Sequence, residues 1–532
     1  MIYKILVVVL TLSFSNLTTN LRAQIYELGK SKSYILTPKP SVKPRINGAK
    51  IFGVRPGSQF LFTVAATGKR PVTFSAKGLP KGLNLNKKNG RITGSIKNTG
   101  KYIVILKATN SYGSTERRFK IIVGGNISLT PPLGWNSWNC FGQDVTAENV
   151  YENAEAMVKT GLINHGWSYI NIDDGWQSGK RGGTYNAILP NKKFPDMQKL
   201  ADSVHSLGLK MGIYSSPWVS AYGGLKYQYA GESADNENGS FRKPVNEKDY
   251  HRIGKYKFEW ADVQQWSKWG IDYVKYDWSP NDLPSIKRMW KALRKSNRDI
   301  VFSVSNGASL KSAPIFMRYV NCIRTTVDLI DSWDRGNSNG HGGPQGVMDI
   351  RRHHPEWRMY SGPGHWADPD MLVVGWTGKP WPTSNGVSHP TKLTPDEQYT
   401  HISLWCLWSA PLIIGSDLTK IDNFTISLLS NDEVLAIDQD PSGEMAKQIF
   451  RGDSCEVWAK NLEDGSKAAG LFNLSIKKSL VVVNWSELCI KGKYIVRDLW
   501  RQKNIGIYND RFKALVPGHG VVLVKLSKQE TN

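Results

Sequence analysis

Short apolar segments alternate with longer stretches suited to helices between residues 129 and 420, and this alternation restricts the fold more than any other feature. The candidate helices lie at 147–160, 197–207, 260–269 and 284–295. Eight apolar segments that end in polar residues lie around them: Pro132–Trp135, Tyr169–Ile172, Lys210–Tyr214, Tyr273–Tyr276, Ile300–Val304, Cys322–Thr326, Asp370–Val374 and Pro411–Ile414. Eight β/α units in about 290 residues match the size of a (β/α)8 TIM barrel, and a doubly wound sheet is the alternative.

The chain outside this region has a different texture. Residues 24–44 are rich in Lys, Pro and Ser and are typical of a linker. Residues 45–125 and 436–532 contain short alternating runs separated by turn residues, which predict an Ig-like β-sandwich and an antiparallel C-terminal β-sandwich. The sequence therefore predicts a multidomain protein with a catalytic barrel at 126–435 between two β-sandwiches.

The first 23 residues have the pattern of a secretory signal peptide. Lys4 precedes an apolar run from Ile5 to Phe14, and a polar stretch follows up to Ala23. This run is too short to span a membrane comfortably, and no later stretch approaches about 18 uninterrupted apolar residues. We expect export to the periplasm or exterior of a bacterial cell and no integral membrane segment, while the oligomeric state is left unknown.

The positive charge of the chain is concentrated near its N-terminus. The whole chain carries a net charge of +24, and residues 1–125 contain 22 Lys and Arg but only two acidic residues, Glu27 and Glu116. A basic module outside the cytoplasm favours contact with an anionic surface or polysaccharide over contact with a nucleic acid. A solvated positive face with no dedicated ligand is the alternative.

The cysteines predict neither a metal site nor a dense disulfide framework. The chain has five scattered cysteines with no CxxC pair and no metal spacing. We expect stability to come from large cores, with one or two bridges left open and at least one thiol free or paired with another chain. The cysteines are Cys140, Cys322, Cys406, Cys455 and Cys489.

The segment Ile271–Trp278 carries the clearest chemical signal. If it is a strand, alternation places Lys275 and Asp277 on the same face. A fixed ammonium group beside a carboxylate keeps that carboxylate ionised, and an ionised, positioned aspartate suits a covalent nucleophile. A buried structural ion pair is the alternative interpretation.

Polar residues at the ends of the other segments would share one rim, because the carboxyl ends of barrel strands meet on one face. Carboxylates, cations and aromatic rings on one rim are typical of a glycoside hydrolase pocket, in which a carboxylate pair performs displacement and proton transfer. A Ca²⁺ or Mg²⁺ site at Asp173, Asp174 and Asp370 is the rival, which nearby Lys275 and Arg324 disfavour. The rim residues are Trp135, Trp138, Asp173, Asp174, Tyr214, Lys275, Asp277, Ser305, Asn306, Arg324, Asp328, Asp368 and Asp370.

Six ordered blocks resemble glycoside hydrolase family 27. They are Pro131–Trp138, Ile172–Trp176, Lys210–Tyr214, Tyr273–Asp277, Arg324–Trp333 and Gly364–Leu372. The resemblance implies a barrel with a C-terminal β domain and a retaining mechanism without a cofactor. The family's members are mostly α-galactosidases, with some α-N-acetylgalactosaminidases and β-L-arabinopyranosidases. Separately, Gly78–Leu85 and Gly90–Gly94 resemble immunoglobulin-type domains of bacterial secreted enzymes, which implies a spacer or adhesion role.

The resemblance also implies residue roles. Asp277 corresponds to the nucleophile and Asp328 to the general acid/base. Asp173 and Asp174 correspond to carboxylates that hold the axial 4-OH and the 6-OH, and Trp138 to an indole that stacks on the sugar ring. The implied substrate-binding residues are Trp138, Asp173, Asp174, Tyr214, Lys275, Ser305, Arg324, Asp370 and Met371.

Two departures from the family pattern concern the rim. The family usually has a disulfide between a cysteine after the nucleophile and the loop after strand three, but Trp278-Ser279 and Ser215–Trp218 contain no cysteine. We expect the insertion from Ala221 to Lys257 to rebuild this rim, with a plain surface loop as the alternative. At strand five, Ser305 replaces a glutamate that reads the 2-OH in the family's α-galactosidases.

The remodelled strand-five loop leaves the preferred sugar open. Ala308 resembles the α-N-acetylgalactosaminidase branch, whereas Asn306-Gly307 departs from it. Asp174 in place of a glutamate leaves room for a 6-CH₂OH group and favours galactose over arabinopyranose. We expect exo-acting release of terminal α-linked galactose, with the other two family activities as alternatives. A non-catalytic carbohydrate-binding protein is a further alternative, which the presence of both Asp277 and Asp328 disfavours.

Overall fold

The computed structural model describes residues 25–27, 36–337, 343–380 and 386–530. The expected signal peptide lies outside these residues. The described residues form two compact units. One contains 36–337, 343–380, 386–393 and Leu404–Met445, and the other contains Ile25–Glu27, Thr394–Ser403 and 446–530. Across the described part of the chain, no helix has both the length and the apolar character that a membrane crossing requires.

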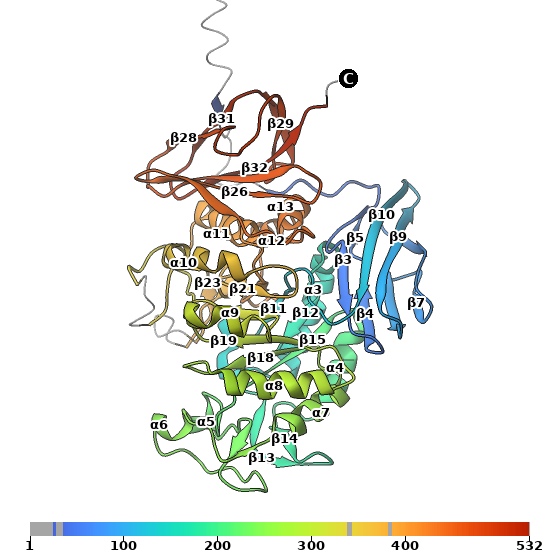
Figure 1. Cartoon of the computed structure of the whole chain (residues 1–532), viewed down its shortest axis with the longest axis vertical. Coiled ribbons are helices and arrows are strands. Elements are labelled where there is room, and N and C mark those ends of the chain that lie inside the picture. The colour runs from blue at the N-terminus through green and yellow to red at the C-terminus, as the bar shows by residue number, and fades with distance from the viewer. Residues whose placement is uncertain (1–24, 28–35, 338–342, 381–385, 531–532) are drawn as a thin grey trace, which may run out of the picture. The chain divides into compact units, whose positions relative to one another are not determined.

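Eight parallel strands form a barrel in the first unit (Figure 1). The first seven strands pair in chain order, the eighth pairs with the first, and a parallel bridge between Leu372, just after the seventh strand, and Ile414 of the eighth completes the ring. This closure confirms the TIM barrel and excludes the doubly wound alternative. The strands are β11 (Leu133–Asn136), β12 (Tyr169–Asn171), β15 (Lys210–Ser215), β18 (Tyr273–Asp277), β19 (Val301–Ser305), β20 (Cys322–Arg324), β21 (Trp366–Asp368) and β24 (Leu412–Ile414).

The seventh barrel strand is not the one predicted. We expected Asp370–Val374, but the strand ends before it, at Asp368. Pro369 has no backbone N–H to donate to a ladder, and Asp370 takes a left-handed conformation with φ of 87°. These two residues turn the chain out of the sheet, so Leu372 contributes only a single bridge.

Helices cover the outside of the barrel, and four of them confirm the predicted stretches. Helix α3 (Ala147–Lys159) begins at a capping box in which the Thr146 side chain and Asn149 bond each other's backbone N–H. The others are α4 (Met197–Ser206), α7 (Glu259–Trp269) and α8 (Leu283–Lys295). In α8, an apolar stripe that includes Ile286, Met289 and Leu293 is buried while the basic residues of its last turn face outward.

The remaining elements lie in the connections, and most of them are shorter. The helical ones are α2 (Trp138–Phe141), η1 (Gly142–Asp144), η2 (Leu162–His165), α5 (Gly224–Tyr227), α6 (Glu247–Tyr250), η3 (Leu310–Ser312), α9 (Ala313–Phe316), α10 (Val347–His353), η4 (His354–Tyr360), α11 (Pro395–Leu407), α12 (Asn423–Leu429) and α13 (Asp432–Asp438). Three small hairpins are formed by β13 (Gln177–Gly182) with β14 (Ala187–Pro190), β16 (Ser233–Ala234) with β17 (Tyr256–Lys257), and β22 (Trp376–Thr377) with β23 (His389–Pro390).

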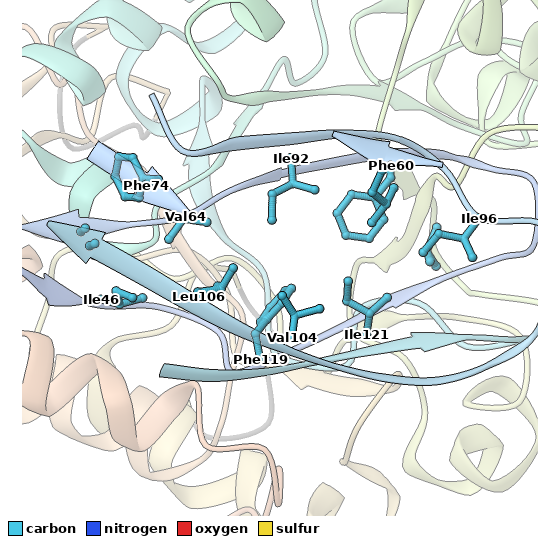
Figure 2. Close-up of a cluster of buried hydrophobic side chains, with 14 of the residues drawn as sticks. Ile46, Phe60, Val64, Phe74, Ile92, Ile96, Val104, Leu106, Phe119 and Ile121 are labelled. Atoms are coloured by element: carbon cyan, nitrogen blue, oxygen red, sulfur yellow. The ribbon is translucent and has the colours of Figure 1, made fainter. Parts of the chain in front are cut away.

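The N-terminal module is the expected β-sandwich. Its sheets have the orders β3-β10-β9-β6 and β4-β8-β7, with a small β2-β5 pair. Alternate residues of the strands point inward and form one core, in which Phe60, Ile92, Val104, Phe119 and Ile121 are fully buried (Figure 2). The strands are β2 (Arg45–Ile46), β3 (Ile51–Val54), β4 (Gln59–Thr63), β5 (Ala66–Thr67), β6 (Thr73–Lys77), β7 (Leu83–Leu85), β8 (Arg91–Ser95), β9 (Gly100–Asn110) and β10 (Gly113–Val123).

This module contacts the amino-terminal ends of the barrel strands. The guanidinium of Arg55 lies 2.5 Å from the carboxylate of Asp299, which precedes β19, and donates to the carbonyl oxygens of Arg294 and Ser296 at 3.0 and 3.1 Å. A charge-assisted contact with several acceptors fixes orientation better than a single bond does. The carboxyl ends of the strands, which carry the polar residues, lie at the opposite end of the barrel from this contact.

The second unit contains the C-terminal sandwich. A six-stranded sheet, β25-β26-β27-β32-β29-β30, packs against a three-stranded sheet, β1-β31-β28. Strand β1 (Ile25–Glu27) lies in the segment that we expected to be a linker, and the Tyr26 hydroxyl donates to Asp498 at 2.7 Å. The other strands are β25 (Lys447–Arg451), β26 (Cys455–Asn461), β27 (Lys467–Asn473), β28 (Ser479–Asn484), β29 (Tyr494–Asp498), β30 (Lys503–Tyr508), β31 (Arg511–Val516) and β32 (Val521–Lys528).

All five cysteines fall within the described residues, and none of them forms a disulfide with another. Cys140, Cys322 and Cys406 are buried among the residues of the barrel unit, where each acts as a small apolar side chain.

Candidate active site

The predicted rim residues meet at the carboxyl ends of the barrel strands. Register places Tyr214 opposite Lys275, Asp277 opposite Ser305 and Arg324 opposite Asp368. Because neighbouring parallel strands carry these residues at matching levels, their side chains surround one site. The structure thus brings together the groups that the sequence predicts there.

Asp277 ends strand β18 and lies beside an ammonium group. The Lys275 Nζ is 2.8 Å from Asp173 and 4.0 Å from Asp277, so it contacts both carboxylates. Asn136 also donates to Asp173, at 2.9 Å. The Asp277 Oδ1 is buried and has no hydrogen-bond partner. An oxygen of this kind is available to a bound molecule.

Burial sets the charge balance of this cluster. Burial raises the pKa of Asp277 to about 6, and the Lys275 ammonium opposes that rise. Burial disfavours the charged form of Lys275 as well, but Asp173 and Asp277 outweigh it and raise the pKa of the ammonium. With a pKa of about 6, Asp277 is mostly ionised at neutral pH, and Lys275 favours this form. Its pKa lies closer to neutral pH than that of an exposed aspartate would.

A second cluster is organised by Arg324 at the end of β20. Its guanidinium contacts the buried Asp370 at 2.8 Å and also the carboxylate of Asp328. The side chain of Asp328 is 39% exposed, whereas that of Asp370 is 3% exposed. Asp370 also accepts from the backbone N–H of Leu329 at 2.7 Å, which fixes the loop that carries Asp328. Asp328 is thus a carboxylate with access to solvent, held by a buried cation.

Asp174 lies in a buried part of the site. Its Oδ2 accepts from the Gly223 N–H at 2.7 Å and from the Gln143 amide at 3.4 Å, while its Oδ1 has no partner. Burial raises the pKa of Asp174 to about 7. The hydroxyl of the buried Tyr214 also has no partner. A ligand rich in hydroxyl groups would satisfy such atoms.

The remaining predicted residues line the site at its edges. Trp138 opens helix α2 just after β11 and is half-buried, and its backbone N–H donates to Asn136 at 2.8 Å. Ser305 and Met371 are buried. Asp368 is buried too, and burial raises its pKa to about 6.

Four groups of the site were missed by sequence reasoning: Asn136, Gln143, Tyr222 and the N–H of Gly223. Asn136 lies two residues before Trp138 and could have been noticed as a strand-end amide. A backbone N–H leaves no signal in a sequence, so Gly223 could not be predicted. Tyr222 and Gly223 both belong to the insertion.

The insertion rebuilds the rim, as we expected, and is more than a surface loop. The loop after β15 is held by several hydrogen bonds, which include Glu232 N–H to Ser216 O at 2.8 Å, Ser233 Oγ to Pro217 O at 2.8 Å, and Val219 N–H to Arg252 O at 3.0 Å. These bonds secure the loop that a disulfide secures in the family pattern.

The rival metal site has little support from the geometry. Among residues 25–27, 36–337, 343–380 and 386–530, no three or more His, Cys, Asp or Glu side chains are arranged to hold a metal ion. Lys275 occupies the space beside Asp173 that a cation would need.

Comparison with known families agrees with this geometry. Residues 130–238 and 250–440 match the family model described as alpha galactosidase A. The chain belongs to this family. Membership makes the protein a glycoside hydrolase, as the blocks around Asp277 predicted. Residues 452–526 match the alpha galactosidase C-terminal beta sandwich domain, and residues 43–124 match an Ig domain family.

Individual relatives of this family 27 chain cover most of its length. An alpha-galactosidase from Cyamopsis tetragonoloba is 33% identical over 434 residues, which are 80% of this chain and 93% of that one. A solved structure from Bacteroides fragilis, provisionally named an alpha-galactosidase, has a TM-score of 0.80 and 30% identity and covers 94% of this chain and 100% of that one. A β-L-arabinopyranosidase from Geobacillus stearothermophilus has a TM-score of 0.64 and 30% identity over 76% of this chain and 98% of that one.

Proposed function

We propose that the protein is a retaining, exo-acting glycosidase that releases terminal α-linked galactose. The observation that carries the proposal is Asp277, a buried carboxylate with one unpartnered oxygen beside Lys275, in a site that also contains the arginine-held Asp328. Retaining glycosidases need this pair: a nucleophile on one side of the sugar and an acid/base on the other.

The reaction would proceed in two displacements. An Asp277 oxygen attacks the anomeric carbon, the bond from that carbon to the leaving oxygen breaks, and Asp328 gives its proton to that oxygen. Asp328 then takes a proton from water, the water oxygen attacks the same carbon, and the bond to Asp277 breaks. The solvent access of Asp328 suits both proton transfers, because the leaving group and the water each approach from outside.

Galactose is the sugar that the pocket supports best. The two neighbouring carboxylates Asp173 and Asp174 offer acceptors for adjacent hydroxyl groups, and Trp138 offers an apolar ring face. With its pKa raised to about 7, Asp174 can donate as well as accept a hydrogen bond near neutral pH. The curated relative described above is named an alpha-galactosidase, which supports this choice.

Turnover of three nitrophenyl glycosides tests the proposal: the α-galactoside, the α-N-acetylgalactosaminide and the β-L-arabinopyranoside. We expect the highest kcat/KM for the α-galactoside, and retention of configuration by NMR of the first product formed. Preference for either other glycoside would replace galactose as the sugar. If the protein turns over none of the three substrates, the result would contradict the enzyme assignment for these substrates and favour a barrel that binds sugars without hydrolysing them.

The pH dependence follows from the nucleophile. We expect kcat/KM to fall about tenfold per unit below pH 6, because Asp277 must be ionised to attack and burial raises its pKa to about 6. The measurement is kcat/KM from pH 4 to 8, with residual activity after return to pH 7 as the control for unfolding. The Asp174→Asn variant should keep the same acid limb, although it removes another carboxyl of the site whose pKa is raised. A flat profile down to pH 4.5 would contradict this role of Asp277.

We propose in addition that the outer face of the sheet β3-β10-β9-β6 contacts an anionic polysaccharide. Lys77, Lys101, Lys107 and Arg118 lie at outward positions of this sheet, and Lys77 and Arg118 both flank the same residue of β9. Glu116 is the acidic residue of these strands, and it pairs with Lys107 at 3.1 Å. The remaining cations give this face a positive charge, which attracts an anionic polymer.

Chromatography on an immobilised anionic polysaccharide tests this contact. The combined Lys77→Ser, Lys101→Ser and Arg118→Ser variant should elute at clearly lower salt than the wild type, since screened charge attraction depends on these cations. The matched control removes three exposed lysines from the C-terminal domain: Lys491→Ser, Lys493→Ser and Lys503→Ser. Equal shifts in both variants would indicate a nonspecific effect of net charge.

We also propose that residues 1–23 direct export to the periplasm or the cell exterior, from the pattern of Lys4 and the apolar run after it. The N-terminal sequence of the mature protein should then begin close to Gln24.

A further inference from the structure

Residues Ala221–Gly224, which we call the strap, are the first residues of the insertion, and they contact the candidate site at Asp174 and Asn306. Ala221 is buried against Tyr214 and Tyr229, and its N–H donates to the Tyr229 carbonyl at 3.1 Å. The Gly224 N–H donates to the Ala221 carbonyl at 2.8 Å. These contacts tie the strap to strand β15, on which Tyr214 lies.

One end of the strap touches Asp174 closely. The Gly223 N–H donates to the Asp174 carboxylate at 2.7 Å. A Cβ at this position would lie 2.6 Å from the Gln143 Nε2 and 2.6 Å from the Tyr229 ring, so only glycine fits without displacing neighbours. The strap is therefore in contact with the pocket through its backbone.

The middle of the strap reaches the loop after β19. The Asn306 Nδ2 donates to the Tyr222 hydroxyl at 2.8 Å, and the Asn306 Oδ1 lies 3.5 Å from the Arg324 Nη2. An arginine can only donate, so the amide oxygen faces Arg324 and the amide NH₂ faces Tyr222. Asn306 has φ of 84°, a left-handed conformation that asparagine tolerates better than most residues. Edge-to-face contact with Trp218, at 5.0 Å between ring centroids, fixes the Tyr222 ring.

The register of the barrel says which part of a sugar this bridge would meet. Asp277 lies opposite Ser305 on the neighbouring strand, and Asn306 directly follows Ser305. A sugar with its anomeric carbon at Asp277 presents the adjoining ring positions to groups on the adjoining strand. The sheet order places β12, after which Asp173 and Asp174 follow, on one side of β18 and places β19 on the other side. With Asp173 and Asp174 on the hydroxyl groups remote from the anomeric carbon, as in the proposed function, the substituent on C2 faces β19 and the Tyr222–Asn306 bridge.

We propose that Tyr222, together with Asn306, is a specificity-determining residue that reads the hydroxyl on C2 of the glycone. The inference rests on the proposed glycosidase function. A hydroxyl at C2 can exchange hydrogen bonds with the Tyr222 hydroxyl and the Asn306 amide. An acetamide at C2 would have to displace the tyrosine, which its packed ring and the tied strap resist. The bridge thus favours galactosides over N-acetylgalactosaminides.

A cycle of variants and substrates tests the proposal. The variants are Tyr222→Phe, which removes only the hydroxyl, and Asn306→Gly, which keeps the left-handed backbone. The substrates are the nitrophenyl α-galactoside and its 2-deoxy analogue. Each variant should lose about tenfold in kcat/KM on the galactoside, the effect of one lost hydrogen bond in a site, and less than about twofold on the 2-deoxy substrate. The control is Tyr256→Phe, which removes an exposed insertion hydroxyl bonded to Glu237.

The outcomes separate the role of Tyr222 from the proposed glycosidase function. Equal losses on both substrates would overturn the inference, because a structural role of Tyr222 does not depend on the sugar's C2 hydroxyl. Unchanged kcat/KM on the galactoside in both variants would overturn it as well. If the wild type turns over neither substrate, the proposed function itself fails, and the inference fails with it.

Discussion

The Asp277→Asn variant should lose at least about 10⁴-fold in kcat/KM and still fold, which is the largest effect that we expect from any substitution in this chain. An amide cannot form the covalent intermediate, and neither Lys275 nor Asp173 can replace the lost nucleophile. Turnover of the nitrophenyl α-galactoside by the purified variant is the measurement. Asp202→Asn, an exposed aspartate on α4, is the matched control and should retain full activity.

The Tm of the Asp277→Asn variant checks that this variant still folds. Burial raises the pKa of Asp277 from its ordinary value to about 6, so the ionised carboxylate weakens the native state above that pH, and the weakening disappears as the pH falls below 4. The neutral amide should therefore leave the Tm at pH 7.5 unchanged or raise it by a few degrees. A marked fall in Tm would mean that lost activity reflects misfolding and would remove the support for a nucleophile.

Chemical rescue gives a second check on the nucleophile. In Asp277→Gly, azide can enter the space of the missing carboxylate and attack the anomeric carbon from the same side. The product should then be the galactosyl azide of inverted, β configuration. An α-azide from this variant would contradict the assignment of Asp277.

The Asp328→Ala variant should show the second largest effect, and its size should depend on the leaving group. We expect about a 10³-fold loss in kcat/KM on a natural disaccharide, whose poor leaving oxygen needs a proton, and a much smaller loss in kcat/KM on a dinitrophenyl galactoside. The reason is that Asp328 supplies the proton only when the leaving group requires it. Steady-state kinetics on both substrates is the measurement, and Asp202→Ala is the control.

Azide again distinguishes the role. In Asp328→Ala the covalent intermediate still forms on Asp277, so azide should attack it and yield the α-azide, with retained configuration. The two variants should therefore give opposite azide anomers. A uniform loss on all leaving groups, or a β-azide from Asp328→Ala, would contradict the acid/base role and indicate that Asp328 only positions Arg324.

Much of the fold could be predicted because its signals are local. Alternation in Ile271–Trp278 identified strand β18 and placed Lys275 and Asp277 on one face, and the structure confirms both. The seventh strand was misplaced because Asp370–Val374 is as apolar as a strand, while Pro369 and the left-handed Asp370 prevent pairing. An apolar run does not reveal the backbone conformation that precedes it.

The candidate site was predicted in its residues but not in its connections. The strand ends supplied Asp173, Asp174, Asp277 and Asp328, because parallel barrel strands bring their carboxyl ends together whatever lies between them. That Arg324 holds Asp328 and Asp370 at once is a matter of distances across loops, which no spacing in the sequence encodes.

The sequence by itself determined the barrel, the two sandwiches and the carboxylates of the rim, since apolar periodicity and strand-end polarity act within a few residues. Only the tertiary structure decided how the insertion is used. The Gly223 N–H meets Asp174 49 residues away in the chain, and Tyr222 meets Asn306 84 residues away. Such contacts exist only after the barrel closes, and the burial that raises the pKa of Asp277 and of Asp174 arises in the same step.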